Sequence, residues 1–143
     1  MTTNKTTRFE GLKDLADGRK AQAARSLAES LGALKAKEAQ LQQLREYLDE
    51  YQQGTGNDAT HDAARWENSR RFLSSLNDAV TRRETELEAA RTRYRREAER
   101  WRDSHRQTRA LEKLVDKYYR EELNELERRD QKELDEQASR VKK

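Results

Sequence analysis

Few side chains in this sequence could do chemistry. The chain has two histidines, His61 and His105, and no cysteine, which excludes a thiol nucleophile, a disulfide and a cysteine-ligated metal. Asp58, His61 and Asp62 could bind a metal ion loosely, but a helix start rich in capping residues explains them better. The sequence contains no glycine-rich phosphate-binding loop. We therefore expect no enzymatic activity, no metal and no cofactor.

Basic side chains form a periodic pattern. Arg95, Arg102 and Arg109 recur every seven residues, which places them along one outward stripe of a helix. Such a stripe could bind nucleic-acid phosphates. However, Tyr94 and Trp101 fall on helix–helix contact positions, where they are not offered for base stacking. We expect a solvated face or one that meets acidic protein, and no nucleic acid.

A short apolar cluster is formed by Phe72, Leu76 and Ala79, spaced i, i+4 and i+7 along a helix. Leu76 falls on a contact position, while Phe72 and Ala79 fall at its edge. Exposed apolar groups often mark interfaces. Two interpretations remain open: Phe72 shields the contact between helices, or it binds another protein.

The composition favours long helices over a broad core. Charged residues make up 41% of the 143 residues, the hydrophobic set only 32%, and proline is absent. Average domains carry roughly 25% charged and 45–50% apolar residues. No run of apolar residues is long enough to span a membrane, and the first residues lack the apolar core of a signal peptide.

One glycine-containing break divides the chain. Residues 54–58 read as a turn, so we expect one all-α domain over residues 1–143, with a first helix at about 8–53 and a second at about 60–138. The first helix is expected to start near Thr7, where Thr7 and Glu10 have the spacing of a capping box.

Both helices carry heptad repeats, with apolar residues at the first and fourth positions, a and d. In the first helix Leu27 and Leu41 are a positions and Leu44 is a d position; in the second Leu73 and Leu87 are a positions. Sustained heptads predict an antiparallel coiled-coil hairpin. The residues expected along its seam are Leu27, Leu34, Leu41, Leu44, Leu48, Trp66, Leu73, Leu87, Tyr94 and Trp101.

The expected register follows from folding about the turn. It places Tyr51 level with Trp66 and Lys37 level with Val80. The second helix is longer than the first, so it would lack an intramolecular partner from about Leu111. We expect this overhang to fray or to be ordered by another protein, and we expect the free chain to be a monomer.

The sequence resembles the FliJ family of flagellar export proteins over nearly its whole length. The first matching block is Arg65-Trp66-x-Asn68-x3-Phe72-x3-Leu76, and the second comprises 130–132, 135–136, Ala138 and Arg140. Residues 12–16 and the Tyr47/Tyr51 pair agree as well.

The resemblance implies a non-enzymatic coiled coil similar to the central stalk of rotary ATPases. Its expected partners are the hexameric flagellar export ATPase, a membrane export-gate protein and export chaperones. The chain would act in flagellum biogenesis, in the cytoplasm and peripherally at the inner membrane of the flagellar base. The residues assigned to the gate are Phe72, Leu76 and Ala79. Those assigned to the ATPase are Arg95, Arg102, Arg109, Arg128, Arg129, Gln131 and Arg140.

Two other functions compete with this one. A stalk of a virulence-type secretion system would share the fold, although the Trp66/Asn68/Phe72 block favours the flagellar branch. A generic coiled-coil scaffold would have no ATPase partner.

Overall fold

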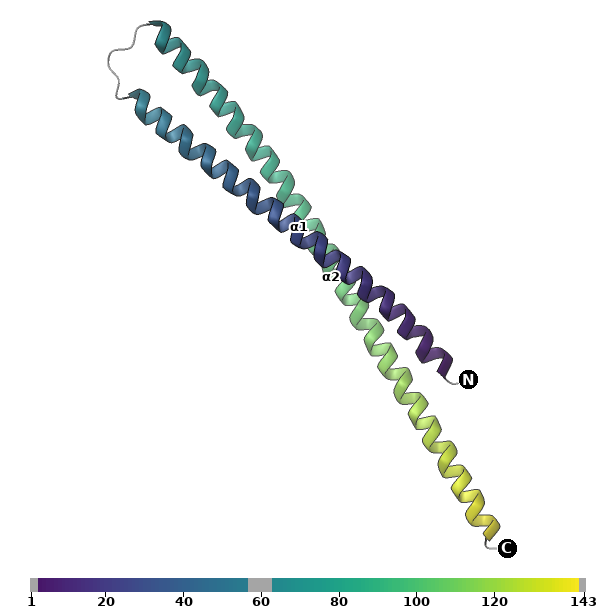
Figure 1. Cartoon of the computed structure of the whole chain (residues 1–143). Coiled ribbons are helices and arrows are strands. Elements are labelled where there is room, and N and C mark those ends of the chain that lie inside the picture. Colours follow the sequence, from purple (N-terminus) through teal and green to yellow (C-terminus); the bar gives the residue numbers. More distant parts are fainter. Residues whose placement is uncertain (1–2, 57–62, 142–143) are drawn as a thin grey trace. The chain divides into compact units, whose positions relative to one another are not determined.

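The computed structural model contains two α-helices, α1 (Thr3–Gly56) and α2 (Ala63–Val141) (Figure 1). The structure describes residues 3–56 and 63–141, and these ranges contain no strand. The helices run antiparallel, because Phe9 near the start of α1 contacts Tyr118 and Tyr51 near its end contacts Phe72. The expected all-α, two-helix antiparallel fold is confirmed.

The helix ends differ from those expected. α1 begins at Thr3 instead of near Thr7 and continues through Gly54 to Gly56. Residues 54–56 of the expected turn are therefore helical, and 57–58 lie outside the described residues. α2 begins at Ala63, and residues 60–62 also lie outside the described ranges. A helix can run through Gly54 because glycine lowers helix stability by only about 1 kcal/mol and does not clash as proline does.

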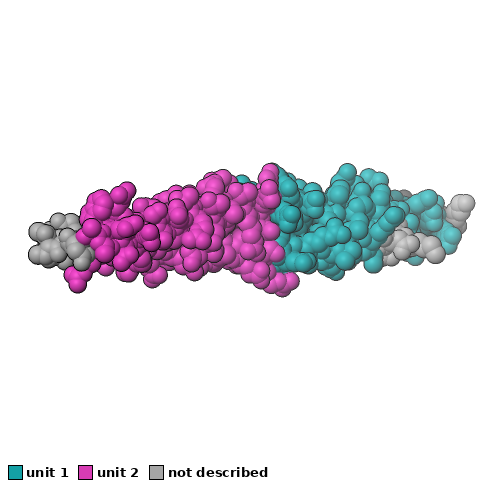
Figure 2. Space-filling model, turned by 90° about the horizontal axis from the view of Figure 1, so that it is seen from above, with its two compact units in different colours: residues 1–24, 100–143 teal, residues 25–99 magenta. Residues whose placement is uncertain are grey.

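The chain divides into two compact units. Unit 1 comprises residues 1–24 and 100–143, and unit 2 comprises residues 25–99 (Figure 2). Each unit contains a segment of α1 packed against a segment of α2.

Unit 2 has a leucine core. Leu41 of α1 and Leu76 and Leu87 of α2 are buried, and Ser30 is fully buried. Ser30 satisfies its hydroxyl by donating to the carbonyl oxygen of Leu27 at 2.8 Å. The small hydroxymethyl group therefore occupies a core position without leaving a polar group unpaired.

Unit 1 is built around smaller side chains. Its buried residues are Ala16, Thr6 and Thr108, and the Thr108 hydroxyl donates to the carbonyl oxygen of Ser104 at 2.9 Å. Thr6 Oγ1 donates to Glu122 Oε1 at 2.6 Å. Small residues let two helices approach closely, but each buries less apolar area than leucine.

The pairing of the helices is displaced by about one heptad from the expected register. Tyr51 packs on Phe72 instead of lying level with Trp66, with ring centroids 4.6 Å apart. Lys37 pairs with Glu86, at 3.1 Å, instead of facing Val80. A shift of one heptad keeps a positions opposite d positions, so both registers satisfy the same apolar pattern.

The unpaired part of α2 starts later than expected. The Thr6–Glu122 hydrogen bond and the Phe9–Tyr118 contact, with centroids 5.0 Å apart, extend the pairing well past Leu111. Lys5 adds a cation–π contact to the Tyr118 ring at 4.6 Å. All described residues of α2 from 123 to 141 are exposed. Among the described residues, the pairing of α2 with α1 therefore extends to Glu122.

Glu86 is the centre of a charged cluster in unit 2. It accepts hydrogen bonds from Lys37 Nζ at 3.1 Å and from Arg83 Nη1 at 3.0 Å. These two cations hold the pKa of Glu86 below its ordinary value of 4.5, and the hydrogen bond from Lys37 has the larger effect. Because the folded state favours the carboxylate, this cluster contributes stability above pH 4.5, and the contribution is lost as the pH falls through the lowered pKa.

Replacing Lys37 with methionine is expected to raise the pKa of Glu86 toward 4.5, because it removes the larger of the two causes. Carboxyl-carbon NMR titration of the variant and the wild type measures this shift. Arg71→Met is the control, because Arg71 pairs with Glu67 on its own helix. An unchanged pKa of Glu86 in Lys37→Met would show that the Lys37–Glu86 pair does not form in solution.

Candidate partner-binding surfaces

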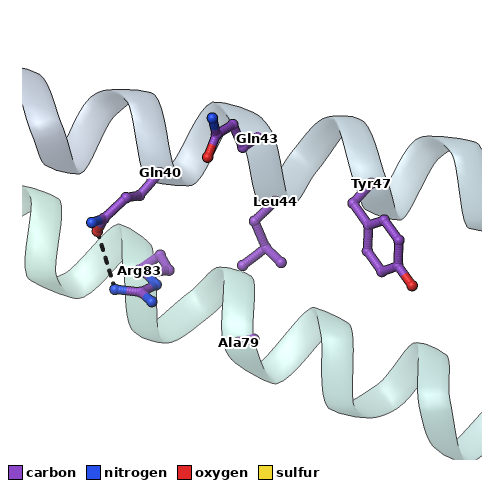
Figure 3. A pocket seen from close by; sticks show the side chains of 6 residues that line it. All are labelled: Gln40, Gln43, Leu44, Tyr47, Ala79 and Arg83. Atoms are coloured by element: carbon purple, nitrogen blue, oxygen red, sulfur yellow. Dashed lines mark hydrogen bonds between the residues drawn. The ribbon is translucent and has the colours of Figure 1, made fainter.

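A groove of about 380 Å³ lies between the helices of unit 2 (Figure 3). Leu44 extends from α1 toward the turn of α2 that carries Ala79, and Tyr47 lines the groove beside it. At the other end Arg83 Nη1 donates to Gln40 Oε1 at 3.2 Å, which joins the two helices across the groove. Leu44, Tyr47 and Ala79 supply apolar and aromatic lining, and Gln40, Gln43 and Arg83 supply polar lining, an arrangement that can take an apolar side chain of a protein partner.

The three residues assigned to the export gate differ in accessibility. Phe72 is 39% exposed, and its ring packs edge-on against Tyr51 and, at 6.4 Å between centroids, against Tyr47. Ala79 lines the groove, whereas Leu76 is buried between the helices. Leu76 can therefore shape this surface but cannot present its side chain to a partner without a rearrangement.

Sequence reasoning missed the α1 half of this surface. Gln40, Gln43, Leu44 and Tyr47 line the groove together with the α2 residues. In the sequence, Tyr47 contributes to the family resemblance but is not predicted to bind a partner. Its exposed ring directly precedes the seam residue Leu48. An aromatic residue at the edge of a seam is the signal that could have identified it.

The expected seam residues are buried or half-buried in the structure with one exception. Trp66 is 56% exposed, and Arg70 lies over its ring at 4.8 Å. The displaced register is consistent with this exposure, because Tyr51, the residue expected level with Trp66, contacts Phe72 instead. The buried or half-buried seam residues are Leu27, Leu34, Leu41, Leu44, Leu48, Leu73, Leu87, Tyr94 and Trp101.

The residues assigned to the ATPase are exposed on α2. Arg129 pairs with Glu125 at 3.0 Å, and Gln131 donates to Asp135 at 3.2 Å. Arg95 lies 4.0 Å from Glu88. Among the described residues, no ion pair holds Arg102, Arg109, Arg128 or Arg140. Arg95 lies in unit 2, and the other residues of this set lie in unit 1.

The described residues contain no cluster of histidine, cysteine and carboxylate groups suited to a metal ion. Asp58, His61 and Asp62 lie outside the described ranges. His105 stacks on Trp101 with centroids 5.2 Å apart. In the described part of the chain, neither helix is long and apolar enough to cross a membrane.

Comparison with known proteins identifies the family. The sequence model described as flagellar FliJ protein matches residues 4–142. The flagellar FliJ protein of Salmonella typhi is 31% identical over 135 residues, which cover 93% of this chain and 92% of that protein. The flagellar FliJ protein of Escherichia coli strain K12 is 30% identical over 132 residues, 91% of this chain and 90% of that protein. The chain therefore belongs to the FliJ family of flagellar proteins.

Proposed function

We propose that this chain is a non-enzymatic component of the flagellar protein export apparatus. In this role it binds the hexameric export ATPase as a central stalk and promotes assembly of its ring. It also links the ring to the membrane export gate and helps to recycle export chaperones, in the cytoplasm and at the inner membrane of the flagellar base. Family membership over residues 4–142 carries this proposal.

The ATPase contact is assigned to unit 1. Its α2 segment continues as an exposed helix from residue 123 to 141, beyond the Thr6–Glu122 contact with α1. A lone helix is marginally stable in water, so a binding partner would stabilise this segment. Arg102, Arg109, Arg128 and Arg140 are exposed in unit 1 and could meet acidic groups of such a partner.

The experiment that tests the proposal measures hydrolysis and ring formation by the flagellar export ATPase of the same organism, with and without the chain. Stimulated hydrolysis and assembled hexamers at about one chain per ring are the expected result. No binding and no stimulation would leave a coiled-coil scaffold, the alternative that the sequence also allows.

Charge reversal of Arg128 and Arg129 to glutamate is expected to weaken ATPase binding several-fold, because two cations become like charges toward an acidic partner. Sedimentation or pull-down at constant salt measures this change. Arg70→Glu/Arg71→Glu is the matched control, since this neighbouring pair is also exposed but lies in unit 2. Unchanged affinity of the Arg128/Arg129 variant would remove both residues from the ATPase surface.

The gate contact is assigned to the groove of unit 2 and to Phe72 at its edge. Phe72→Ala is expected to weaken gate binding while leaving helicity and ATPase binding intact. Because Phe72 also packs on Tyr51, a second variant, Ala79→Gln, fills the groove without removing that contact. Circular dichroism and gate pull-down separate the effects: a melted hairpin with Phe72→Ala and normal binding with Ala79→Gln would make these residues structural.

A further inference from the structure

The heptad pattern of unit 2 fits two pairings of α1 with α2. In the pairing seen in the structure, which we call the observed register, Tyr51 contacts Phe72. Displacing α1 by one heptad places Tyr51 level with Trp66 instead. It also places Leu44 level with Leu73, and a positions again lie opposite d positions. We call this displaced pairing the second register, and an apolar seam can form in either of the two.

Trp66 is a seam residue that the observed register leaves uncovered. It occupies an a position, yet its side chain is exposed and its ring contacts Arg70 of its own helix. An aromatic side chain of this size stabilises a fold mainly through the large apolar area that it buries. In the second register Tyr51 lies against Trp66, so this area is buried there and not in the observed register.

The glycines at the end of α1 also suit the second register. Gly54 and Gly56 lie inside the helix in the structure, where glycine is less favourable than alanine. Residues 54–58 combine these two glycines with asparagine and aspartate, a composition typical of chain reversals. In the second register the chain reverses at these residues, and both glycines leave the helix.

Polar contacts between the helices favour the observed register. Lys37 of α1 pairs with Glu86 of α2 at 3.1 Å, and their side chains are 35% and 45% exposed. Arg45 of α1 pairs with Glu84 of α2 at 2.9 Å, and both side chains are about half exposed. The second register breaks both pairs. Exposed ion pairs stabilise a fold only weakly, so weak interactions decide between the two registers of unit 2.

Contacts of unit 1 add to the preference for the observed register. Because both helices are continuous, a displacement of α1 changes the pairing in unit 1 as well. The Thr6–Glu122 hydrogen bond and the Phe9–Tyr118 ring contact form in the observed register and are lost in the second. The second register is therefore the minor state.

We infer that the hairpin is a two-state element in which α1 slides along α2 by one heptad, from the observed register to the second register and back. The slide forms and removes the groove of unit 2, because Leu44 faces Ala79 only in the observed register (Figure 3). A ligand that binds one of two states shifts the population toward that state. Any ligand of the groove therefore holds the observed register.

The test measures distances between spin labels by pulsed electron paramagnetic resonance. The chain has no cysteine, so Ala39→Cys/Glu99→Cys places one label on each helix of unit 2, at exposed positions. A slide of one heptad lengthens their separation along the helix axis by about 10 Å, at 1.5 Å per residue. Asp78→Cys/Glu99→Cys is the control pair, because both labels lie on α2. Dilution with unlabelled chain removes distances between molecules.

Glu84→Gln/Glu86→Gln is expected to raise the fraction of the longer distance about three- to ten-fold over the wild type, because it weakens both ion pairs between the helices. Glu67→Gln/Glu88→Gln is the matched control. It removes two acidic groups that pair only within α2 in the structure, so the fraction is expected to stay unchanged. Adding Trp66→Gln to the first variant is expected to lower the fraction about five-fold or more, because the second register then buries no tryptophan.

Three outcomes would overturn the inference. The first is a single distance in both the wild type and the Glu84→Gln/Glu86→Gln variant. The second is a longer distance that persists undiminished after Trp66→Gln, because helices that merely splay apart do not need Trp66. The third is a longer distance in the control pair on α2, which would report a break in that helix instead of a slide.

Discussion

Replacing Leu41 with alanine is expected to lower the free energy of unfolding of unit 2 by about 3 kcal/mol. Leu41 is only 3% exposed, the lowest value among the buried leucines. The core of unit 2 is a single seam between α1 and α2, so few neighbouring side chains can move in to fill the space that the truncation leaves. Removing buried methyl groups costs both their transfer free energy and the cavity. Chemical denaturation followed by circular dichroism measures the effect, and amide exchange assigns it to unit 2.

Leu15→Ala is the matched control for this prediction. Leu15 lies on the same helix and loses the same atoms, but it is 63% exposed. The free energy of unfolding of the Leu15→Ala variant is expected to differ from that of the wild type by about 0.5 kcal/mol or less. Equal effects at Leu41 and Leu15 would contradict the position of Leu41 in the core.

The heptad pattern was sufficient to predict the fold. Leu41, Leu44 and Leu87 repeat at a and d positions, and these positions are buried or half-buried in the structure. The absence of proline and the high content of charged residues indicate two long helices, each of which buries one apolar stripe, and the structure has two long helices. Only the period of the apolar residues is needed for this conclusion, and the period can be counted in the sequence.

The register could not be obtained in the same way. A slip of one heptad moves each a residue to the next d residue of the partner helix, and the burial pattern does not change. Residues 54–56 of the expected turn belong to α1 in the structure, and residues 57–58 lie outside the described residues. In the structure Tyr51 contacts Phe72 instead of Trp66, and the pairing of α2 reaches Glu122.

The groove shows the same limit at the candidate site. Phe72 and Ala79 could be chosen from their edge positions on α2, but the α1 residues opposite them depend on the register. Leu44 faces Ala79 only because the helices are displaced by about one heptad from the expected pairing. For a surface shared by two helices, the sequence can indicate the edge residues of each helix separately. Which residues of one helix face those of the other is known only from the structure.

Replacing Gly11, Gly18 and Gly32 with alanine is expected to raise the free energy of unfolding by about 2–3 kcal/mol in total. All three lie inside α1, and a Cβ added at any of them would meet no heavy atom within 4 Å. The helical backbone at these positions has no positive φ, so alanine fits without strain. Glycine loses more backbone entropy than alanine when the chain folds into a helix, so each substitution lowers the entropic cost of folding. Thermal and chemical denaturation of the triple variant measures the gain.

Gly54→Ala is the control for the glycine variant, because Gly54 is also open to solvent but lies in the last turn of α1. Helix ends fray, so this substitution is expected to stabilise less than any of the internal ones. A loss of stability in the triple variant would show that something other than open space surrounds these glycines.

The three internal glycines lie on the side of α1 away from the seam, so the triple variant also tests whether this side contacts a partner. If the triple variant is more stable yet binds the export ATPase or the gate more weakly, the missing side chains make room for a partner; if binding is unchanged, the glycines are merely tolerated.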